Sequence, residues 1–282
     1  MIEKFEIKTD RGSIPLLDNP YFTLTDIDGF TRADSEISSV VIPYVDGDYV
    51  NTTRVIPRIA VIYLRLKESA GIDLAKRYLM QFIKPKKTAS LHIIRNEKDV
   101  ELSGIVQKIE LPRFAQGCTM AVTLHCSNPY WQDSEYIIGE ITKILKTHYF
   151  PLPEGLAFHD EGIVMGVFEQ GVVQDVANSG DTETGMLITI YARGTAVNPQ
   201  ITNTETGEFI GASVTMRSGD ELVINTLRGQ KSITLNGENI IDRLTAKSTF
   251  LQLGLGANEF RISAEYGLSD LSFTMLYKQQ YV

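Results

Sequence analysis

The stretch Met120-Ala-Val-Thr-Leu-His-Cys126-Ser-Asn-Pro-Tyr-Trp131 predicts a strand that closes a β domain. Its first seven residues alternate between two faces, as in a strand with one buried face. The expected core face carries Met120, Val122, Leu124 and Cys126. Pro129 then ends the strand, because proline has no N–H to donate to a neighbouring strand. We therefore expect a domain boundary at Trp131.

Three residues at this boundary, Pro129, Tyr130 and Trp131, are expected to form an apolar wedge between two domains. Trp131 is the only tryptophan in the chain. A length of 282 residues suits two domains of about 130–150 residues each. We expect a first domain over residues 1–131, a linker over 132–160 and a second domain over 161–282.

Composition excludes several classes of protein. An apolar content of 43% is enough for two folded cores. The net charge of −8 argues against stable nucleic-acid binding, which usually needs a basic surface. The one basic cluster, Lys84-Pro-Lys-Lys87, is interpreted as the charged end of a helix. No apolar run approaches the roughly 20 residues of a membrane-spanning helix, so we expect cytoplasmic synthesis, no cleaved signal and no membrane insertion.

The first half is expected to be antiparallel sheet with one helix. The helix is predicted over residues 69–83, with Ser69 as its N-cap and an apolar face that includes Ala75 and Leu79. The segment 58–67 is almost continuously apolar, which predicts a strand covered on both sides. Other strands are expected at 2–8, 21–27, 89–95, 100–111 and 117–127. One helix on such a sheet indicates a β-sandwich or split barrel.

The second half shows turns and short strands but no convincing helix. Asn236-Gly237 lies between two strand-like segments and has the signature of a β-hairpin turn. In the linker, the apolar spacing over residues 137–145 fits either a short helix or an extended strand. A galectin-like jelly-roll β-sandwich is expected. Its strands are predicted at 162–168, 172–177, 186–193, 209–216, 220–226, 231–235, 249–253, 258–265 and 270–278.

No catalytic, cofactor or metal site is expected. The four histidines, His92, His125, His148 and His159, lack metal-ligand spacing. His125 and Cys126 are adjacent on a strand, so their side chains point to opposite faces and cannot act as a pair. His159-Asp-Glu161 is interpreted as a solvated linker, and Gly254-Leu-Gly256 as a turn. The two cysteines, Cys118 and Cys126, would lie about 26 Å apart on one strand, too far for a disulfide.

One loop invites a calcium interpretation. Asp46, Asp48 and Asn51 supply oxygen donors, but the loop lacks the glycine and glutamate placement of an EF-hand. Asp46-Gly47 is also a strong turn signal. We therefore favour a tight turn without a metal.

Several motifs, taken in order along the chain, resemble those of phage distal tail proteins. Asp46-Gly47 follows Ile42-Pro43, and Cys126-Ser-Asn-Pro-Tyr-Trp131 stands at mid-chain. The remaining motifs are Phe150-Pro-Leu-Pro153, Asn178-Ser-Gly-Asp181, Asn198-Pro199-Gln-Ile, Ser248-Thr-Phe-Leu-Gln-Leu-Gly-Leu-Gly-Ala-Asn258 and the closing Tyr277 to Val282. The resemblance covers essentially the whole chain.

This resemblance implies a structural protein of the virion tail tip. The first domain would form a homohexameric ring on the tail tube, and the second would project outward. Implied partners are the tail tube protein, the tape measure protein, a tail-associated lysin or tail spike hub protein, and receptor-binding proteins. Such a ring needs head-to-tail contacts, which we expect from strand 2–8 or from the excursion over residues 28–56.

The alternative is a lectin-like host-recognition module. Sugar sites often stack sugars on an exposed tryptophan, and residues 161–282 contain none. The tyrosines there, Tyr191, Tyr266, Tyr277 and Tyr281, are expected to pack within or across strands. A scaffold is therefore favoured over a lectin.

Overall fold

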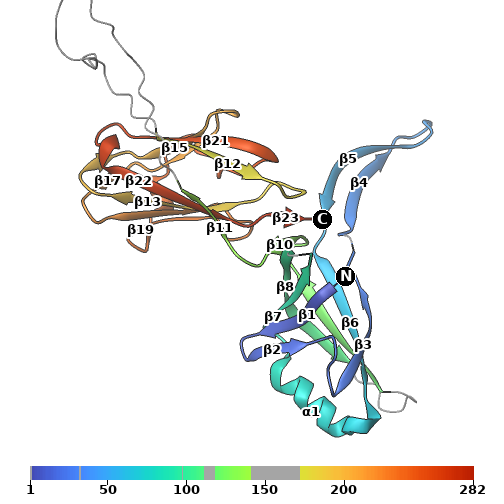
Figure 1. Cartoon of the computed structure of the whole chain (residues 1–282). Helices are drawn as coiled ribbons and strands as arrows, with labels where there is room; N and C mark the ends of the chain where they lie inside the picture. The colour runs from blue at the N-terminus through green and yellow to red at the C-terminus, as the bar shows by residue number, and fades with distance from the viewer. Residues whose placement is uncertain (1, 32, 97, 111–117, 141–171) are drawn as a thin grey trace, which may run out of the picture. The chain divides into compact units, whose positions relative to one another are not determined.

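The computed structural model describes residues 2–31, 33–96, 98–110, 118–140 and 172–282. The chain forms two units (Figure 1). Unit 1 contains Met1–Glu135 together with Gln280–Val282, and unit 2 contains Tyr136–Gln279. Most described residues outside turns are in strands, which confirms the mainly β class.

Unit 1 is built on a nine-stranded antiparallel sheet. Its main path has the order β2-β1-β7-β8-β9-β6-β3, and β10 pairs with both β8 and β23. The strands are β1 (Ile2–Thr9), β2 (Gly12–Pro15), β3 (Phe22–Asp28), β6 (Arg58–Leu66), β7 (Thr88–Arg95), β8 (Lys98–Glu110), β9 (Thr119–Cys126), β10 (Trp131–Asp133) and β23 (Gln280–Tyr281).

Strand alternation places the core of unit 1 on one face of this sheet. In β9, alternate residues from Met120 to Cys126 are buried, as predicted. In β6 the prediction of cover on both sides is wrong, because burial alternates there and Ile59 and Arg65 are exposed. The apolar run of β6 reflects β propensity on its outer face, which carries the half-exposed Val61 and Tyr63.

The helix α1 (Ile72–Phe82) packs through the buried Ala75 and Leu79, as its spacing predicts. Ser69 is not its N-cap. A short 3₁₀ turn, η1 (Glu68–Ala70), precedes the helix, and Gly71 takes the cap position with φ 81°. Glycine adopts this left-handed conformation without the strain that a side chain would add.

Strands β4 (Ser35–Val41) and β5 (Asp48–Val55) form a separate two-stranded hairpin between β3 and β6. The hairpin continues the β3–β6 ribbon after a break, since the Ile56 N–H donates to the Asp34 carbonyl at 3.0 Å. In Figure 1 it stands clear of the main sheet of unit 1. The sequence over residues 28–56 predicts an excursion from the sheet but not these two paired strands.

Unit 2 is a sandwich of two sheets that share one apolar core. One sheet has the order β11-β22-β13-β18-β19-β20 and the other β12-β21-β15-β16, with β14 and β17 as a separate pair. The strands are β11 (Ile137–Glu140), β12 (Val172–Asn178), β13 (Met186–Ala192), β14 (Ala196–Val197), β15 (Gln200–Asn203), β16 (Phe209–Gly211), β17 (Thr215–Met216), β18 (Glu221–Asn225), β19 (Ser232–Leu235), β20 (Glu238–Asn239), β21 (Gly256–Ser263) and β22 (Leu271–Tyr277). Two 3₁₀ turns, η2 (Ile241–Arg243) and η3 (Leu268–Asp270), complete it.

Several sequence predictions for unit 2 are confirmed and one is wrong. Asn236 and Gly237 have φ 52° and 83° and link β19 to β20 as predicted. The expected strand at 249–253 is not formed, because only an isolated bridge joins Leu253 to Thr184. Residues 137–140 are extended, while 141–145, His148, Phe150–Pro153, His159–Glu161 and the expected strand at 162–168 lie outside the described residues.

The observed division differs from the expected one at both ends of the second half. Strand β10 and residues up to Glu135 belong to unit 1, whereas β11 already pairs with β22 of unit 2. The last three residues return to unit 1, where Tyr281 pairs with Trp131. Unit 2 is therefore inserted between two segments of unit 1.

Trp131 is 7% exposed and packs within the core of unit 1, with its ring edge-on to Phe30 at 5.4 Å. We expect Trp131→Ala to lower the free energy of unfolding by about 3–5 kcal/mol, because it leaves a cavity among buried side chains. Denaturant titration measures this loss, and Tyr266→Ala at an exposed site of unit 2 is the control. Red-shifted, easily quenched tryptophan emission from the wild type would contradict the burial.

Candidate functional site

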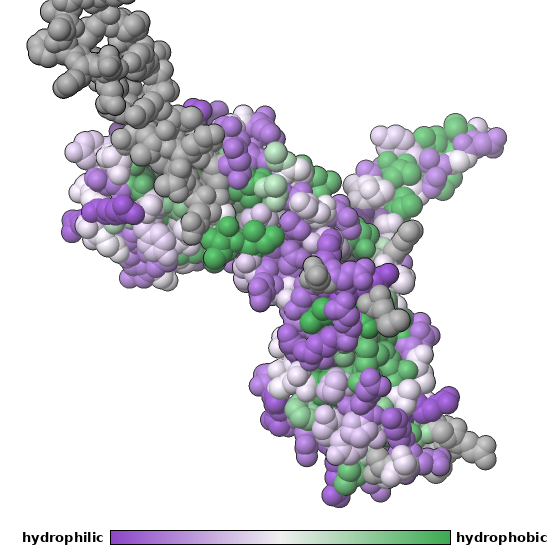
Figure 2. All heavy atoms as spheres, viewed as in Figure 1, coloured by the Kyte–Doolittle hydropathy of each residue, from purple (hydrophilic) through white to green (hydrophobic). Residues whose placement is uncertain are grey.

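The hairpin β4–β5 exposes apolar side chains with no cover from the described residues. Every residue of both strands is exposed. Figure 2 shows apolar side chains interspersed with polar ones along this arm. A two-stranded hairpin is marginally stable alone, and large exposed apolar patches mark interaction sites. The exposed apolar residues from root to apex include Ile37, Val40, Val41, Ile42, Val45, Tyr49, Val50 and Val55.

The two faces of the hairpin differ in character. The strand register places Ile37, Val41, Val50 and Val55 on one face. The opposite face carries an ion pair in which the Arg54 Nε–H donates to Glu36 Oε2 at 2.8 Å. The ion-pair face also carries the exposed pair of Val40 and Tyr49, so both faces of the hairpin present apolar side chains to solvent.

The apex of the hairpin is a turn that ends at Gly47, with φ 92°. Tyr44 has φ 67° and a fully exposed ring. A bulky residue in this left-handed region is strained, and such strain often accompanies function. The predicted turn at Asp46-Gly47 is present. No group of three potential metal ligands occurs among the described residues, including those around Asp46 and Asp48.

The root of the hairpin is where the chain leaves β3 and re-enters β6. One carbonyl group holds it. The Phe30 oxygen accepts the indole N–H of Trp131 at 3.3 Å and the Nη1–H of Arg58 at 3.2 Å. Gly29, with φ 71°, approaches β6 so closely that a Cβ would lie 2.1 Å from the Ile59 oxygen. Glycine is required there by both its conformation and its contact.

Arg58 is an uncompensated charge at this root. The residue is 3% exposed, and its Nε and Nη2 have no hydrogen-bond partner among the described residues. Burial lowers the pKa of Arg58, while the nearby Cys126 and Asp34 oppose that effect. Buried donors without acceptors destabilise a fold, so Arg58 is a local weakness beside the hairpin.

A cavity of about 370 Å³ lies beside the root. Its aromatic walls come from Phe30, Trp131 and Tyr281, and Lys98 lies over the Tyr281 ring, 4.9 Å from its centroid. The other lining residues are Ile2, Thr31, Ile93, Arg95 and Val100. An apolar cavity with aromatic walls and cationic groups suits an aromatic or aliphatic side chain near an acidic group.

A polar network covers part of the opposite face of the sheet. His92 is buried and contacts Lys8 Nζ through Nδ1 at 3.0 Å and Glu101 Oε2 through Nε2 at 2.9 Å. The same Nδ1 also lies 3.3 Å from Asp99 Oδ1, so one ammonium and two carboxylate groups surround the imidazole. Lys4 forms an ion pair with the buried Glu6 at 3.0 Å. The network is a set of paired side chains, as expected of structural polar groups.

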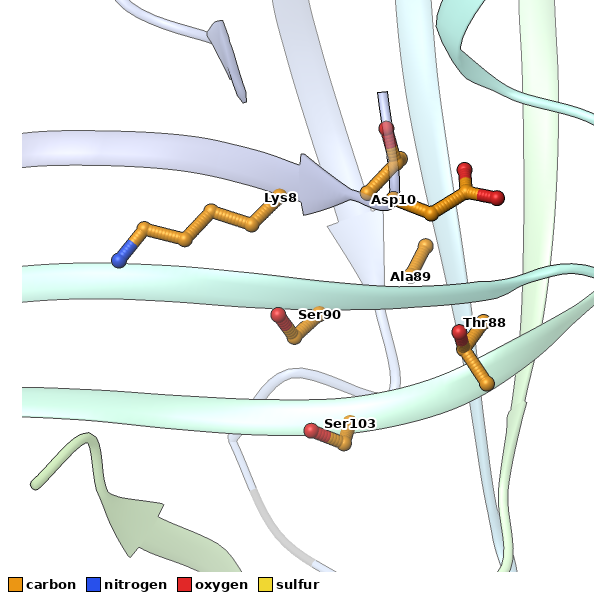
Figure 3. A pocket seen from close by; sticks show the side chains of 7 residues that line it. Lys8, Asp10, Thr88, Ala89, Ser90 and Ser103 are labelled. Atoms are coloured by element: carbon orange, nitrogen blue, oxygen red, sulfur yellow. The ribbon is translucent and has the colours of Figure 1, made fainter. Parts of the chain in front are cut away.

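A shallow polar pocket of about 220 Å³ adjoins this network (Figure 3). Ser90, Ser103 and Thr88 supply hydroxyl groups, while the Lys8 side chain extends away from Asp10. The Lys8 amine is engaged with His92. No described contact joins one of these hydroxyls to a base, so the pocket lacks the nucleophile–base arrangement of covalent catalysis.

Cys126 and Cys118 are both free thiols. Burial raises the pKa of the Cys126 thiol to about 11, against a smaller opposite effect of Arg58. A buried protonated thiol is a poor nucleophile, and His125 lies on the other face of β9 as predicted.

The predicted wedge residues lie at the junction in sequence, with Tyr130 and Trp131 buried. Trp131 packs in the core of unit 1, so residues of unit 1 alone account for its burial. Its role between domains stays a prediction. Tyr277 is buried in the core of unit 2, and Tyr191 lies in β13 opposite Glu221 of β18, as expected. The packing expected for Tyr266 is wrong, since this residue is exposed and lies outside the strands.

The second unit matches a known family. Residues 179–281 match the model described as siphovirus-type tail component, C-terminal domain. This part of the chain is therefore similar to the siphovirus-type tail component domain. The resemblance to phage distal tail proteins is thereby confirmed for these residues. No curated protein sequence is significantly similar to the chain.

Solved structures extend the similarity of fold beyond the tail component domain. The SPP1 Dit (gp 19.1) protein, described as a paradigm of the hub adsorption apparatus in phages infecting Gram-positive hosts, has a TM-score of 0.66 at 14% identity, over 99% of both chains. A chain of the phage P2 baseplate in its activated conformation with Ca has a TM-score of 0.54 at 11% identity, over 100% of both chains. Its counterpart with Sr has 0.51 at 12%, over 99% of both. Both units therefore share a fold with phage tail proteins.

We expect Arg58→Met to leave the free energy of unfolding unchanged or to raise it by about 1 kcal/mol, because methionine fills the site without unpaired donors. The Phe30 oxygen keeps its hydrogen bond from Trp131. Arg58→Ala removes the packing as well and should destabilise the chain. Denaturant titration of both variants measures the contrast. A loss of more than about 2 kcal/mol in Arg58→Met would show that the guanidinium is satisfied.

Cys126 predicts a specific loss of stability at alkaline pH. Its folded-state pKa is raised to about 11 from the usual 9.0, so its contribution is complete below pH 9 and is lost as pH rises to 11. Denaturant titrations of the wild type and Cys126→Ala at pH 8 and 10.5 should show a smaller pH effect in the variant. Cys118→Ala, which retains Cys126, should follow the wild type; equal pH effects in all three proteins would contradict the assignment.

Proposed function

We propose that this chain is a distal tail protein that forms a hexameric ring and joins the tail tube to the baseplate or host-adsorption apparatus. The observation that carries the proposal is the exposed apolar hairpin β4–β5 on unit 1 of a chain whose second unit is a tail component domain. A tail component functions within an assembly, and this hairpin needs cover that its own unit does not supply.

Ring closure requires the same head-to-tail contact between successive copies. Of the two expected sources, the excursion over residues 28–56 contains the hairpin and offers such a surface. Strand β1 is less suitable, since its second half pairs with β2 on one side and β7 on the other. Only its first residues, Ile2 to Lys4, are open on the β2 side, since the Phe5 carbonyl accepts the Leu16 N–H.

The proposed partners follow from the tail-tip position. Unit 1 would contact the tail tube and tape measure proteins. On the side away from the tube, the ring would contact a tail-associated lysin or tail spike hub protein. Unit 2 would carry receptor-binding proteins. The similar structures, described as a hub of an adsorption apparatus and as a baseplate, support this placement. The protein would be made in the cytoplasm of the bacterial host and function in the virion tail.

The proposed role is structural and involves no catalysis, cofactor or stable binding of nucleic acid. The buried thiol of Cys126 and the paired His92 network have structural explanations. The net charge of −8 per chain disfavours adhesion to DNA that passes through a ring. Among the described residues, no helix is sufficiently long and apolar to cross a membrane.

The lectin-like alternative concerns unit 2. Its exposed aromatic residues include Tyr266, which is 67% exposed and could stack on a sugar. The tryptophan that would most favour sugar stacking lies instead in the core of unit 1. Glycan binding that is lost in Tyr266→Ala without a change in melting temperature would favour this alternative.

Molar mass in solution and images of intact tails test the ring. A hexamer would have a mass of about 190 kDa, six times the 31.5 kDa of one chain. Light scattering of the purified full chain should detect this species or its intermediates, and labelled tails should show the ring at the tip. The control is an unrelated monomeric protein with a mass similar to that of one chain, which should show no larger species. A chain that is monomeric both in solution and in tails would contradict the proposal.

A further inference from the structure

We propose that the apex of the hairpin, residues 42–48, docks into the cavity at Trp131 of a second copy of this chain. This inference rests on the proposed ring and names the two surfaces that join its neighbours. Three observations carry it: an exposed aromatic anchor at the apex, a matching apolar cavity, and complementary charges around both.

Tyr44 is the anchor. Its ring is fully exposed although its backbone is held in the left-handed region at φ 67°. Ile42 and Val45 on either side are also exposed. Tyrosine is enriched among the residues that dominate binding energy, because it buries a large rigid area with little loss of rotamer entropy. Its conformation presents the ring away from its own hairpin.

The cavity suits such an anchor. Its volume of about 370 Å³ lies between Phe30, Trp131 and Tyr281, with Ile2 and Val100 among the other walls. Aromatic rings here can contact an inserted ring edge-on or offset, and Phe30 and Trp131 already pack edge-on at 5.4 Å. The walls come from elements of the unit's own core, so the site is already formed.

The charges match. Asp46 and Asp48 flank the apex, and neither has an ion pair or side-chain hydrogen bond among the described residues. At the cavity, Arg95 and Lys98 are exposed, and no ion pair joins either of them to a carboxylate in the part of the chain that the structure describes. Each acidic group of the apex can therefore find a cation beside the cavity. Such pairing orients a contact and suppresses incorrect ones.

The partner is a second copy because the hairpin cannot reach its own cavity. The cavity lies at the root through Phe30 and Thr31, whereas strands of seven and eight residues place the apex about 25 Å away. A unit of this length has a radius of gyration of about 14 Å, so a side-by-side neighbour lies within reach. The contact uses different surfaces on each copy, as ring closure requires.

A charge exchange in the full chain tests the contact. Asp46→Lys with Asp48→Lys, and separately Arg95→Glu with Lys98→Glu, should each weaken self-association at least about tenfold. The chain that carries all four changes should associate within about threefold of the wild type. Tyr44→Ala should weaken association at least about tenfold. Tyr266→Ala, an exposed tyrosine of unit 2, is the matched control and should have no effect.

A second measurement applies even if the isolated chain is monomeric. Val45→Cys, which keeps the Tyr44 anchor, combined with Ile2→Cys should give linear and closed multimers with a short bismaleimide crosslinker, in solution or in assembled tails. Val45→Cys alone is the control for Cys118 and Cys126. Unchanged melting temperatures establish that every variant is folded.

Different results would contradict the docking contact and the ring. A ring that persists in every apex and cavity variant, without crosslinks from Val45→Cys, overturns the docking contact and leaves the ring intact. Crosslinking of Val45→Cys to a different tail protein overturns the choice of a second copy. A chain that is monomeric in solution and in tails overturns both proposals.

Discussion

The hairpin root and the cavity of unit 1 both depend on the carbonyl oxygen of Phe30. It accepts hydrogen bonds from Trp131 and Arg58, which come from β10 and β6. These two bonds fix the chain where it leaves β3, and Gly29 allows the close approach to β6. The direction in which the hairpin leaves the sheet and the aromatic wall of the cavity therefore share one origin.

The molecule combines two cores, whose apolar faces are buried, with one hairpin whose apolar side chains are exposed. The sandwich of unit 2 and the sheet of unit 1 bury their apolar faces within themselves. The hairpin β4–β5 instead exposes both faces, and its root contains the unpaired donors of Arg58. The buried cores stabilise the fold. The exposed apolar surface of the hairpin lies beside the unpaired donors of Arg58, which lower stability locally. Functional surfaces often occur at such positions.

The sequence predicts elements whose signal is local. The alternation of β9 and the Asn236-Gly237 turn depend on neighbouring residues, and both predictions were confirmed. The hairpin was not recognised as two strands, because its residues have no core against which a period of two would develop. The cavity was also beyond prediction, since Phe30, Trp131 and Tyr281 come together only through the tertiary fold. The alternation of burial in β6 was not predicted, because apolar residues with high β propensity also occupy its outer face. In sequence, such a strand looks the same as one that is buried on both sides.

The return of β23 to unit 1 has a consequence for biosynthesis. Tyr281 pairs with Trp131 and donates a hydrogen bond from its hydroxyl to Asp133 at 3.0 Å, across a separation of 148 positions. The sheet of unit 1, which is translated first, is therefore completed only after unit 2 has been translated. Contacts of such long range form slowly, because a large loop must close first. A chain that stops before Tyr281 lacks this pairing and the Tyr281 wall of the cavity.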